Sequence, residues 1–392
     1  MRHFLCKNRF QLLKIHQTRR TSTETRHKRH VSVFYKSKSV LFYNFAASNQ
    51  PYTAMLNGHG DDSYRYNRKI TLNFSSNVYH HTSLAPLFRH LENCWEQVRS
   101  YPEPSPHAVE NKLAQTMGVS AESVCLTSGA TEAIYLVAQA FSGRRSYILS
   151  PTFSEYADAC RLHGHQVRSI YTTDHLPEDA DIVWICNPNN PTGVVLPHDE
   201  MKRLAAQHPA VLFVIDQSYE DFTLRRLFSP HEAAALPNVI LLHSLTKRFG
   251  IPGLRVGYLT ARQEWTARVR QNKMPWSVNT LALEAALFLT EHEKDFRFDL
   301  QALLEERARV ARQLEALHIA EVWPGETHYL LARLRMGKAS ALKDYLAETH
   351  GMLIRDAGNF EGLDERYFRI AVQSPEEDDR LLSAIGEWMF SI

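Results

Sequence analysis

Short apolar runs alternate with amphipathic stretches through the middle of the chain. The runs are four or five residues long and rich in Val, Ile and Leu, as in strands that are buried on both faces. This order predicts an α/β fold, with a mostly parallel sheet covered by helices on both faces. We expect strands at Val124–Thr127, Tyr147–Ser150, Ile182–Cys186, Leu212–Ile215, Val239–His243 and Val256–Thr260. We expect covering helices at Ala130–Phe141, Tyr156–His163 and His198–Gln207.

The pattern changes after this region. Arg262–Arg312 has the periodicity of a long helix with one interruption, at Met274-Pro275, and the remainder has that of a small α+β domain. A chain of 392 residues is long enough for two domains. In the small domain we expect strands at His328–Leu334 and Tyr367–Val372, and helices at Lys338–Glu348 and from Pro375. The predicted organisation is an N-terminal arm at 55–85, a large domain at 86–290 and a small C-terminal domain at 291–392.

The segment His243–Tyr258 places a lysine among groups that bind phosphate. Lys247 follows the hydroxyl residues Ser244 and Thr246 and precedes Arg255 by eight positions. A lysine that bonds to an aldehyde cofactor needs such neighbours, because they hold the cofactor's phosphate while the amine meets its aldehyde carbon. Taken alone, the segment could also be a strand end followed by a surface loop.

The spelling of this segment, SLTKRFGIPGLRVGY, resembles the lysine motif of fold-type I pyridoxal-phosphate enzymes. It is similar, more narrowly, to histidinol-phosphate aminotransferases and, nearer still, to the L-threonine-O-3-phosphate decarboxylases of cobalamin synthesis. The resemblance covers nearly all of the chain after Met55. It implies the fold-type I aminotransferase fold, with the arm packed against the small domain, and pyridoxal 5'-phosphate bound to Lys247.

Further motifs match positions that this family uses around the cofactor ring. Asp216 ends a strand-like run, where a carboxylate can pair with the protonated pyridine nitrogen and keep the ring electron-accepting. The spelling NPNNPTG at 187–193 is a close match, and the resemblance implies that Asn190 donates to the phenolic oxygen. The resemblance also assigns Tyr219 to that oxygen and Phe153 to the ring face, although Phe153 could be an ordinary core residue.

The helix expected after Ser128-Gly129 is a candidate phosphate site. Small residues let backbone N–H groups approach an anion, and the start of a helix adds partial positive charge. The family usually has Gly-Asn-Gly just before this helix, whereas this chain has Thr127-Ser128-Gly129. By resemblance, the residues expected to hold the phosphate are Ala130, Thr131, Ser244, Thr246 and Arg255.

Tyr101, in the stretch RSYPEPS, matches a tyrosine that reaches the cofactor phosphate of the neighbouring subunit in the family. The resemblance therefore implies a symmetric homodimer whose active sites are shared between chains.

Two C-terminal arginines are candidate substrate ligands. By resemblance, Arg369 in RYFRIAV holds the substrate carboxylate, because a guanidinium can bind a carboxylate through two hydrogen bonds. Arg355 in LIRD matches a residue that binds a substrate phosphate. The resemblance adds His59 and Asn77, both N-terminal to the large domain, to this substrate site.

The resemblance favours decarboxylation of L-threonine O-3-phosphate to (R)-1-aminopropan-2-yl phosphate and CO2, with Lys247, Asp216 and Tyr219 as the catalytic residues. The alternative is an aminotransferase of the histidinol-phosphate type. Both stay open, because the outcome depends on which bond at Cα stands perpendicular to the cofactor ring.

Two non-enzymatic classes compete with this interpretation. A transcription regulator with an aminotransferase-like sensor domain needs an N-terminal helix-turn-helix, and the first 54 residues lack its helical periodicity. A catalytically inactive scaffold has no need of Lys247, Asp216, Asn190 and Arg255, all of which are present.

The first 54 residues differ in charge from the rest. They hold 11 Lys and Arg residues and one acid, Glu24, whereas the whole chain has a net charge of +2. Such a segment buries too little apolar surface to offset the entropy of ordering, so we expect a basic, disordered leader. It could be a transit peptide, an arm for nucleic acid or a membrane surface, or a leader upstream of a true start at Met55. We favour the last, because recognisable enzyme sequence begins just after Met55.

Five scattered cysteines without a C-x-x-C pair favour a reduced, cytoplasmic setting. No apolar run approaches the length of a membrane span. The adjacent pair His80-His81 does not have the spacing of metal ligands, and we expect no metal. The expected partners are a small phosphorylated amino-acid substrate and a second copy of the chain, with neither nucleic acid nor membrane.

Overall fold

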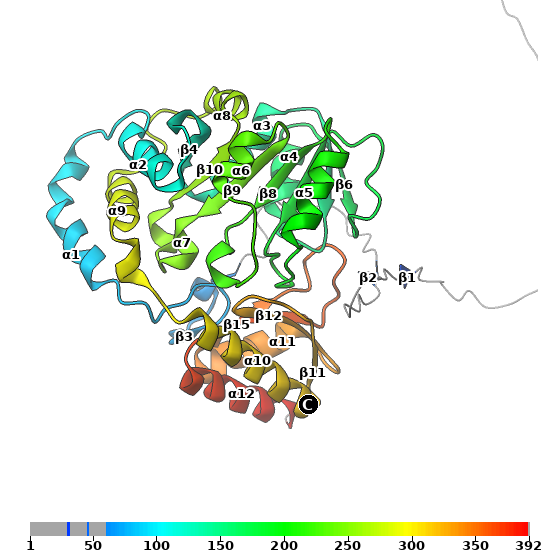
Figure 1. Cartoon of the computed structure of the whole chain (residues 1–392). Helices are drawn as coiled ribbons and strands as arrows, with labels where there is room; N and C mark the ends of the chain where they lie inside the picture. Colours follow the sequence, from blue (N-terminus) through cyan, green and yellow to red (C-terminus); the bar gives the residue numbers. More distant parts are fainter. Residues whose placement is uncertain (1–29, 32–44, 47–59, 391–392) are drawn as a thin grey trace, which may run out of the picture.

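The computed structural model describes residues 30–31, 45–46 and 60–390. Strand β1 (His30–Val31) pairs antiparallel with β2 (Phe45–Ala46). The rest of the expected leader, the expected start at Met55 and the predicted substrate residue His59 lie outside the described residues. From residue 60 onward, a large sheet flanked by helices stands above a smaller sheet with its own helices (Figure 1).

Seven strands form the large sheet, in the order β4-β10-β9-β8-β7-β5-β6. The pairs β9–β8, β8–β7, β7–β5 and β5–β6 are parallel, whereas β10 is antiparallel to both β4 and β9. The predicted α/β fold with a mostly parallel sheet is therefore confirmed. The strands are β4 (Val124–Thr127), β5 (Arg145–Leu149), β6 (Gln166–Ile170), β7 (Ile182–Cys186), β8 (Leu212–Asp216), β9 (Val239–Ser244) and β10 (Gly257–Ala261).

Alternate residues of the central strands enter two separate cores. Trp184 and Val214 pack on the face covered by α3, α4 and α8, whereas Val183 and Phe213 pack on the face covered by α5 and α6. All residues of β7 and β8 are buried, which explains why these strands are continuous apolar runs. The nine helices α1–α9 are Ala85–Asn93, His107–Met117, Gly129–Ala140, Glu155–Leu162, His198–Gln207, Pro230–Ala235, Leu245–Arg248, Gln263–Arg270 and Thr280–Glu291.

Two sequence expectations need correction. Strand β6 was not predicted, because it lies at the edge of the sheet and alternates exposed polar residues with the half-exposed Val167 and Ile170 instead of forming a buried apolar run. The single break expected within Arg262–Arg312 was wrong, since a second interruption separates α9 from α10 (Leu300–Ala316). Asp299 explains the new start, because its side chain accepts a hydrogen bond from the backbone N–H of Ala302.

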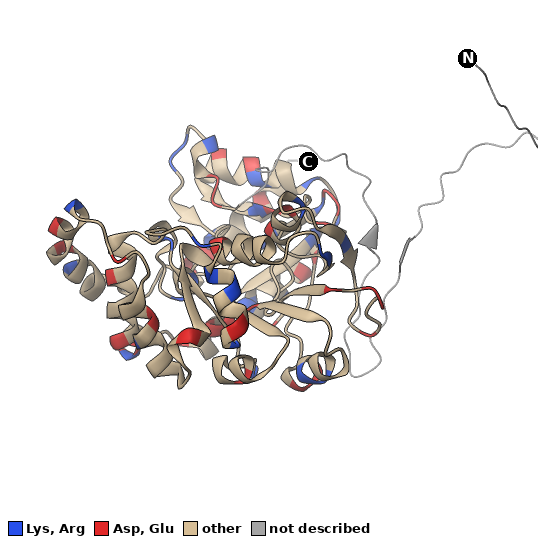
Figure 2. Ribbon diagram, turned by 90° about the horizontal axis from the view of Figure 1, so that it is seen from above, with Lys and Arg blue, Asp and Glu red and all other residues tan. Residues whose placement is uncertain are grey.

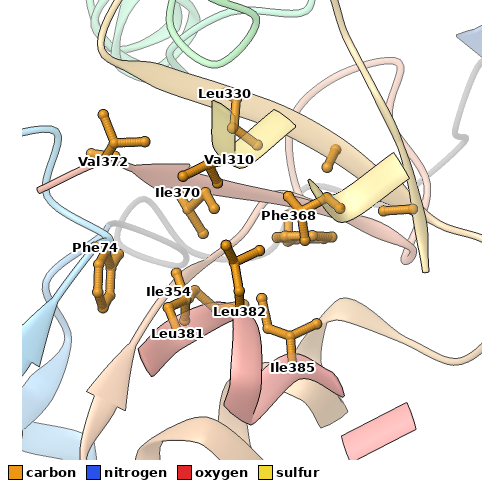
Figure 3. Close-up of a cluster of buried hydrophobic side chains, with 14 of the residues drawn as sticks. Phe74, Val310, Leu330, Ile354, Phe368, Ile370, Val372, Leu381, Leu382 and Ile385 are labelled. Atoms are coloured by element: carbon orange, nitrogen blue, oxygen red, sulfur yellow. The ribbon is translucent and has the colours of Figure 1, made fainter. Parts of the chain in front are cut away.

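The small sheet has the order β11-β12-β15-β14, and all its neighbours are antiparallel. Its strands pack against α10 and α12 through a cluster of fully or nearly fully buried side chains that includes Leu330, Phe368, Ile370, Leu381 and Ile385 (Figure 3). Helix α12 begins with a capping box between Ser374 and Glu377. The elements are β11 (Ala320–Val322), β12 (Tyr329–Leu334), α11 (Ala339–Tyr345), β13 (Met352–Leu353), β14 (Arg355–Asp356), β15 (Tyr367–Ala371) and α12 (Pro375–Met389).

Residues that precede α1 lie against the small sheet and its helices. Strand β3 (Leu72–Asn73) pairs parallel with β13, and Phe74 belongs to the same core as α10 and α12. The strongest polar link is between the Lys343 ammonium and the Asp62 carboxylate, 2.6 Å apart, with both side chains buried. This ion pair joins the segment before α1 to α11.

Charged residues of both signs are interspersed over the helices of the described part (Figure 2). Within the same residues, the structure has no helix with the length and apolarity that crossing a bilayer requires.

We predict that Lys343→Met lowers the free energy of unfolding by up to about 3–5 kcal/mol at pH 7, because it leaves the buried Asp62 carboxylate with only the mostly exposed Arg65 guanidinium as a cation. Urea unfolding measures this change. Lys338→Met is the matched control: Lys338 is ion-paired with Glu365 in the same domain, but both side chains are mostly exposed, so its loss is at most about 1 kcal/mol. Equal losses of unfolding free energy in the two variants would contradict the proposed stabilisation by the buried Lys343–Asp62 pair.

The same pair predicts a pH effect. Burial raises the pKa of Asp62, but the hydrogen bond and charge of Lys343 outweigh burial and hold the pKa below its ordinary value of 3.8. The stabilisation is therefore complete above about pH 3.8 and disappears as the pH falls through the lower, folded-state pKa.

Candidate active site

The candidate site lies at one edge of the large sheet. Strands β4, β5, β7, β8 and β9 all end at this edge, and the antiparallel β10 begins there. Loops at the carboxyl ends of parallel strands are the usual position of ligand sites in α/β folds. Side chains from these ends and from the small sheet line a cavity of about 240 Å³. Most of the predicted site residues line it: Ala130, Thr131, Phe153, Asn190, Asp216, Tyr219, Ser244, Thr246, Lys247, Arg255, Arg355 and Arg369.

Lys247 lies in α7, directly after β9, and its amine points into the cavity. Nζ donates a hydrogen bond to the backbone oxygen of Ser76 at 3.3 Å and lies 6.0 Å from the centre of the Tyr219 ring. Burial, followed by the charges of Arg369 and Arg255, lowers the pKa of Lys247 to about 8. A substantial fraction of the amine is therefore neutral, and hence nucleophilic, near neutral pH.

Asp216 provides a buried carboxylate to the same cavity. Its Oδ1 accepts a hydrogen bond from the Ser218 N–H and its Oδ2 accepts one from the Tyr156 hydroxyl, both at 2.8 Å. Burial raises the pKa of Asp216 above its ordinary value, although the two hydrogen bonds oppose this shift. Among the described residues, no Lys or Arg forms an ion pair with Asp216. The site therefore has a carboxylate that a cationic ligand group can neutralise.

A pocket suited to an anion forms where α3 begins. Gly129 has a φ of 80°, which favours glycine, and a Cβ there would lie 2.6 Å from a guanidinium nitrogen of Arg255 and displace the end of that side chain. Arg255 itself has a positive φ of 59°, which is strained for a residue with a side chain. The hydroxyls of Ser244 and Thr246 lie 2.7 Å apart in the same pocket. The amide groups at the helix start, the hydroxyls and the guanidinium are suited to a phosphate.

Two buried arginines face the other end of the cavity. Arg355 and Arg369 are directly opposite each other on the antiparallel strands β14 and β15. Arg355 donates to the Asp356 backbone oxygen and to Asn359 Oδ1, at 2.6 and 2.7 Å. Burial and then the charge of Arg369 lower the pKa of Arg355 to about 10. Like charges at paired positions destabilise a sheet, so this arrangement indicates an anionic ligand.

Arg369 is held by neutral acceptors rather than by an acid. Its guanidinium donates to Asn190 Oδ1 and to the Ser75 backbone oxygen. Within the described residues, neither Arg369 nor Arg355 forms an ion pair with a carboxylate. Four cationic side chains therefore line the cavity, Lys247, Arg255, Arg355 and Arg369, beside the acids Asp61 and Asp216.

Two of the predicted site residues do not line this cavity. Asn77 is fully buried beside it, with a φ of 52°. Tyr101 is 85% exposed and instead contacts the ring of Trp276, with 5.3 Å between ring centres. Its contact with the cofactor phosphate of a neighbouring subunit stays a prediction.

Sequence reasoning missed several residues of the cavity. Tyr156 positions Asp216, whereas the sequence pattern indicates it only as the first residue of an expected helix. Ser75 and Ser76 contribute backbone oxygens from the segment before α1, so their side chains carry no signal in the sequence. Asn359 orients Arg355, and its position four residues later could have suggested the contact.

The fold and the site together define the class of protein. Residues 69–385 match the family "Aminotransferase class I and II", so the chain belongs to this family and is an enzyme.

The most similar relatives include two phosphate-using groups. The chain is 31% identical over 335 residues to a threonine-phosphate decarboxylase from Salmonella typhimurium, which covers 80% of this chain and 90% of that protein. The structure of an L-threonine-O-3-phosphate decarboxylase from Porphyromonas gingivalis matches with a TM-score of 0.79 and 37% identity, covering 81% of this chain and 99% of that one. A histidinol-phosphate aminotransferase from Sinorhizobium meliloti, solved in complex with pyridoxal-5'-phosphate, shares the fold, with a TM-score of 0.74, 19% identity and coverage of 84% and 94%.

We predict that Lys247 reacts with amine reagents at lower pH than other lysines, because only the neutral amine reacts. Competitive labelling of cofactor-free protein followed by mass spectrometry should show a midpoint near pH 8 for Lys247, compared with 10.5 for an unperturbed lysine. Lys338, whose pKa is raised by Glu365, provides an internal reference in the same sample. If Lys247 and Lys338 were labelled with the same pH dependence, the proposed electrostatic effect on Lys247 would be wrong.

Proposed function

We propose that this enzyme decarboxylates L-threonine O-3-phosphate to (R)-1-aminopropan-2-yl phosphate and CO2. Support comes mainly from the cavity, where the buried pair Arg355 and Arg369 has no acid partner among the described residues. A substrate with two anionic groups on one small molecule neutralises both guanidinium groups. L-threonine O-3-phosphate has a carboxylate and a phosphate, whereas histidinol phosphate has a phosphate and no carboxylate. The similarity to the two threonine-phosphate decarboxylases named above also supports this reaction.

The cofactor is pyridoxal 5'-phosphate, and the residues present fit it. The pocket at the start of α3 suits its phosphate, and the part-buried face of Phe153 lines the space next to Asp216. The Asp216 carboxylate, held by two hydrogen bonds, suits a protonated pyridine nitrogen. Asn190 and Tyr219 line the same cavity on the side of Arg369, where the ring's phenolic oxygen is expected. When bound there, the cofactor supplies an electron-accepting ring to the bond that breaks at Cα.

The roles of the protein's own groups follow from their positions. Arg369 is proposed to bind the carboxylate and Arg355 the phosphate of the substrate, which orients the substrate before reaction. Lys247, with a pKa near 8, would hold the proton that is returned to Cα after CO2 leaves. Tyr156 keeps Asp216 in place and favours its charged form. The alternative activity, amino transfer, uses the same groups but breaks the Cα–H bond.

The test is product analysis with purified, cofactor-loaded enzyme. With L-threonine O-3-phosphate we expect stoichiometric CO2 and the aminopropanol phosphate, without amino transfer to 2-oxoglutarate. Arg355→Gln should raise the KM for this substrate about 10–100-fold, as expected for a lost charged hydrogen bond of roughly 1.5–3 kcal/mol. Arg333→Gln is the matched control, because Arg333 lies on the same small sheet and pairs with Asp364 outside the cavity.

Different outcomes separate the parts of the proposal. Amino transfer to 2-oxoglutarate without CO2 release would overturn the decarboxylase assignment and favour the aminotransferase. An Arg355→Gln variant with unchanged KM for the phosphorylated substrate would overturn the role of Arg355 and leave the reaction itself untouched.

We also propose that the enzyme is a homodimer with shared active sites. Tyr101 and Trp276 are in contact and exposed, and further large apolar side chains are exposed on and near α1 and the loop before α9. Exposed apolar side chains gathered in one region indicate an interaction surface. The exposed side chains are Phe88, Trp95, Val98, Tyr101, Met274 and Trp276.

Mixing two inactive variants tests the shared site. A Lys247→Ala chain and a Tyr101→Ala chain, refolded together in equal amounts, should regain about a quarter of the wild-type sites, because half of the dimers are hybrids with one intact site each. Light scattering should give twice the mass of one chain. A monomer by light scattering, or a mixture no more active than the Tyr101→Ala protein alone, would contradict the proposal.

The remaining proposal concerns location. The described cysteines, Cys94, Cys125, Cys160 and Cys186, are all free and buried, and they are compatible with the cytoplasmic setting that we propose.

A further inference from the structure

Three potential metal ligands meet between α1 and α9, away from the residues that line the active-site cavity. His90 lies in the last turn of α1, Cys94 is the residue directly after this helix, and Glu284 lies in α9. His90 and Cys94 are four residues apart, so their side chains lie on the same face of the helix. The Cys94 thiol is buried, whereas the His90 and Glu284 side chains are 30% and 26% exposed.

One candidate ligand atom from each side chain lies within 4 Å of the other two. His90 Nε2 lies 3.2 Å from Glu284 Oε2, Cys94 Sγ lies 3.8 Å from His90 Nε2, and Cys94 Sγ lies 3.6 Å from Glu284 Oε2. In tetrahedral zinc sites, bonds of about 2.0–2.3 Å place the corresponding N···O, N···S and S···O pairs roughly 3.3, 3.6 and 3.5 Å apart. The three observed separations differ from these values by at most roughly 0.2 Å.

The surroundings of the three groups also suit a cation. The His90 ring stacks on Phe288, one turn after Glu284 in α9, at 4.5 Å between ring centres and 18° between planes, which fixes the orientation of Nε2. Among the described residues, no Lys or Arg forms an ion pair with Glu284. A divalent ion would neutralise the Glu284 carboxylate and the Cys94 thiolate together.

We propose that His90, Cys94 and Glu284 bind one divalent transition-metal ion, of which Zn²⁺ fits the donor set best. A thiolate and an imidazole favour Zn²⁺ over Mg²⁺ or Ca²⁺, which prefer oxygen ligands. The partial exposure of His90 and Glu284 leaves the fourth position open to water. The ion joins the end of α1 to the middle of α9 and stabilises this pair of helices. The inference does not depend on the proposed decarboxylase activity.

The experiment compares metal binding by the whole, cofactor-loaded protein and by single variants. Each protein is dialysed against EDTA, then against Zn²⁺, and its metal is counted by mass spectrometry while calorimetry gives the affinity. We expect the wild type to bind one more equivalent than Cys94→Ser, His90→Gln or Glu284→Gln. His292→Gln, at the end of α9 and outside the cluster, is the matched control and should bind as the wild type does. Cys6 and the histidines of residues 1–59 are present in every variant, so their uptake cancels in the comparison.

A second measurement covers the case in which a substitution at this helix contact impairs folding. Co²⁺ added to metal-free wild type should give the intense visible bands of a four-coordinate ion, and Zn²⁺ should protect Cys94 from alkylation. Equal Zn²⁺ uptake by the wild type and all cluster variants would overturn the proposal. So would weak, six-coordinate Co²⁺ bands together with unprotected Cys94, because the three side chains would then form only a hydrogen-bonded cluster.

Discussion

The common edge of the parallel strands is the constraint on which the candidate site depends. Strands β4, β5, β7, β8 and β9 run in the same direction, so the residues that follow them meet although they are far apart in the sequence. Asp216 needs only to end β8, and Lys247 needs only to follow β9, for the two to line one cavity. Close packing is part of this constraint, since a Cβ on Gly257 would lie 2.6 Å from the backbone nitrogen of Ala130. The order and direction of the strands therefore determine where the site lies, and the polar interactions only adjust the positions of its side chains.

Electrostatics distinguishes the two ends of the cavity. At the sheet, Asp216 is a single buried carboxylate that suits a cationic ring, and the pocket at α3 suits a phosphate. At the small domain, Arg355 and Arg369 are held as a like-charged pair across neighbouring strands. Such a pair costs stability in the free protein, and an anionic substrate offsets that cost on binding. Burial, followed by the charges of Arg369 and Arg255, holds the pKa of Lys247 near 8, so Arg369 also affects the reactivity of the amine.

Much of this arrangement could be predicted from the sequence because it depends on local patterns. The strands β7, β8 and β9 are buried apolar runs, and Asp216 and Lys247 stand at their ends. The edge strand β6 could not be predicted in this way, because solvent exposure removes the apolar pattern. Contacts between distant segments were also hidden. Tyr156 and Asp216 are 60 positions apart, and the backbone oxygens of Ser75 and Ser76 have no sequence signature. The cluster of Cys94 and Glu284 joins residues 190 positions apart, which is why the sequence suggested no metal ligands.

The central claim is that Lys247 bonds covalently to pyridoxal 5'-phosphate, and one measurement tests it most directly. Cofactor-loaded protein is reduced with borohydride, digested and mapped by mass spectrometry. The account predicts a pyridoxyl group on the peptide that contains Lys247, and its loss in Lys247→Ala protein. A pyridoxyl group on another lysine only, or none at all in protein that has bound the cofactor, would contradict the account.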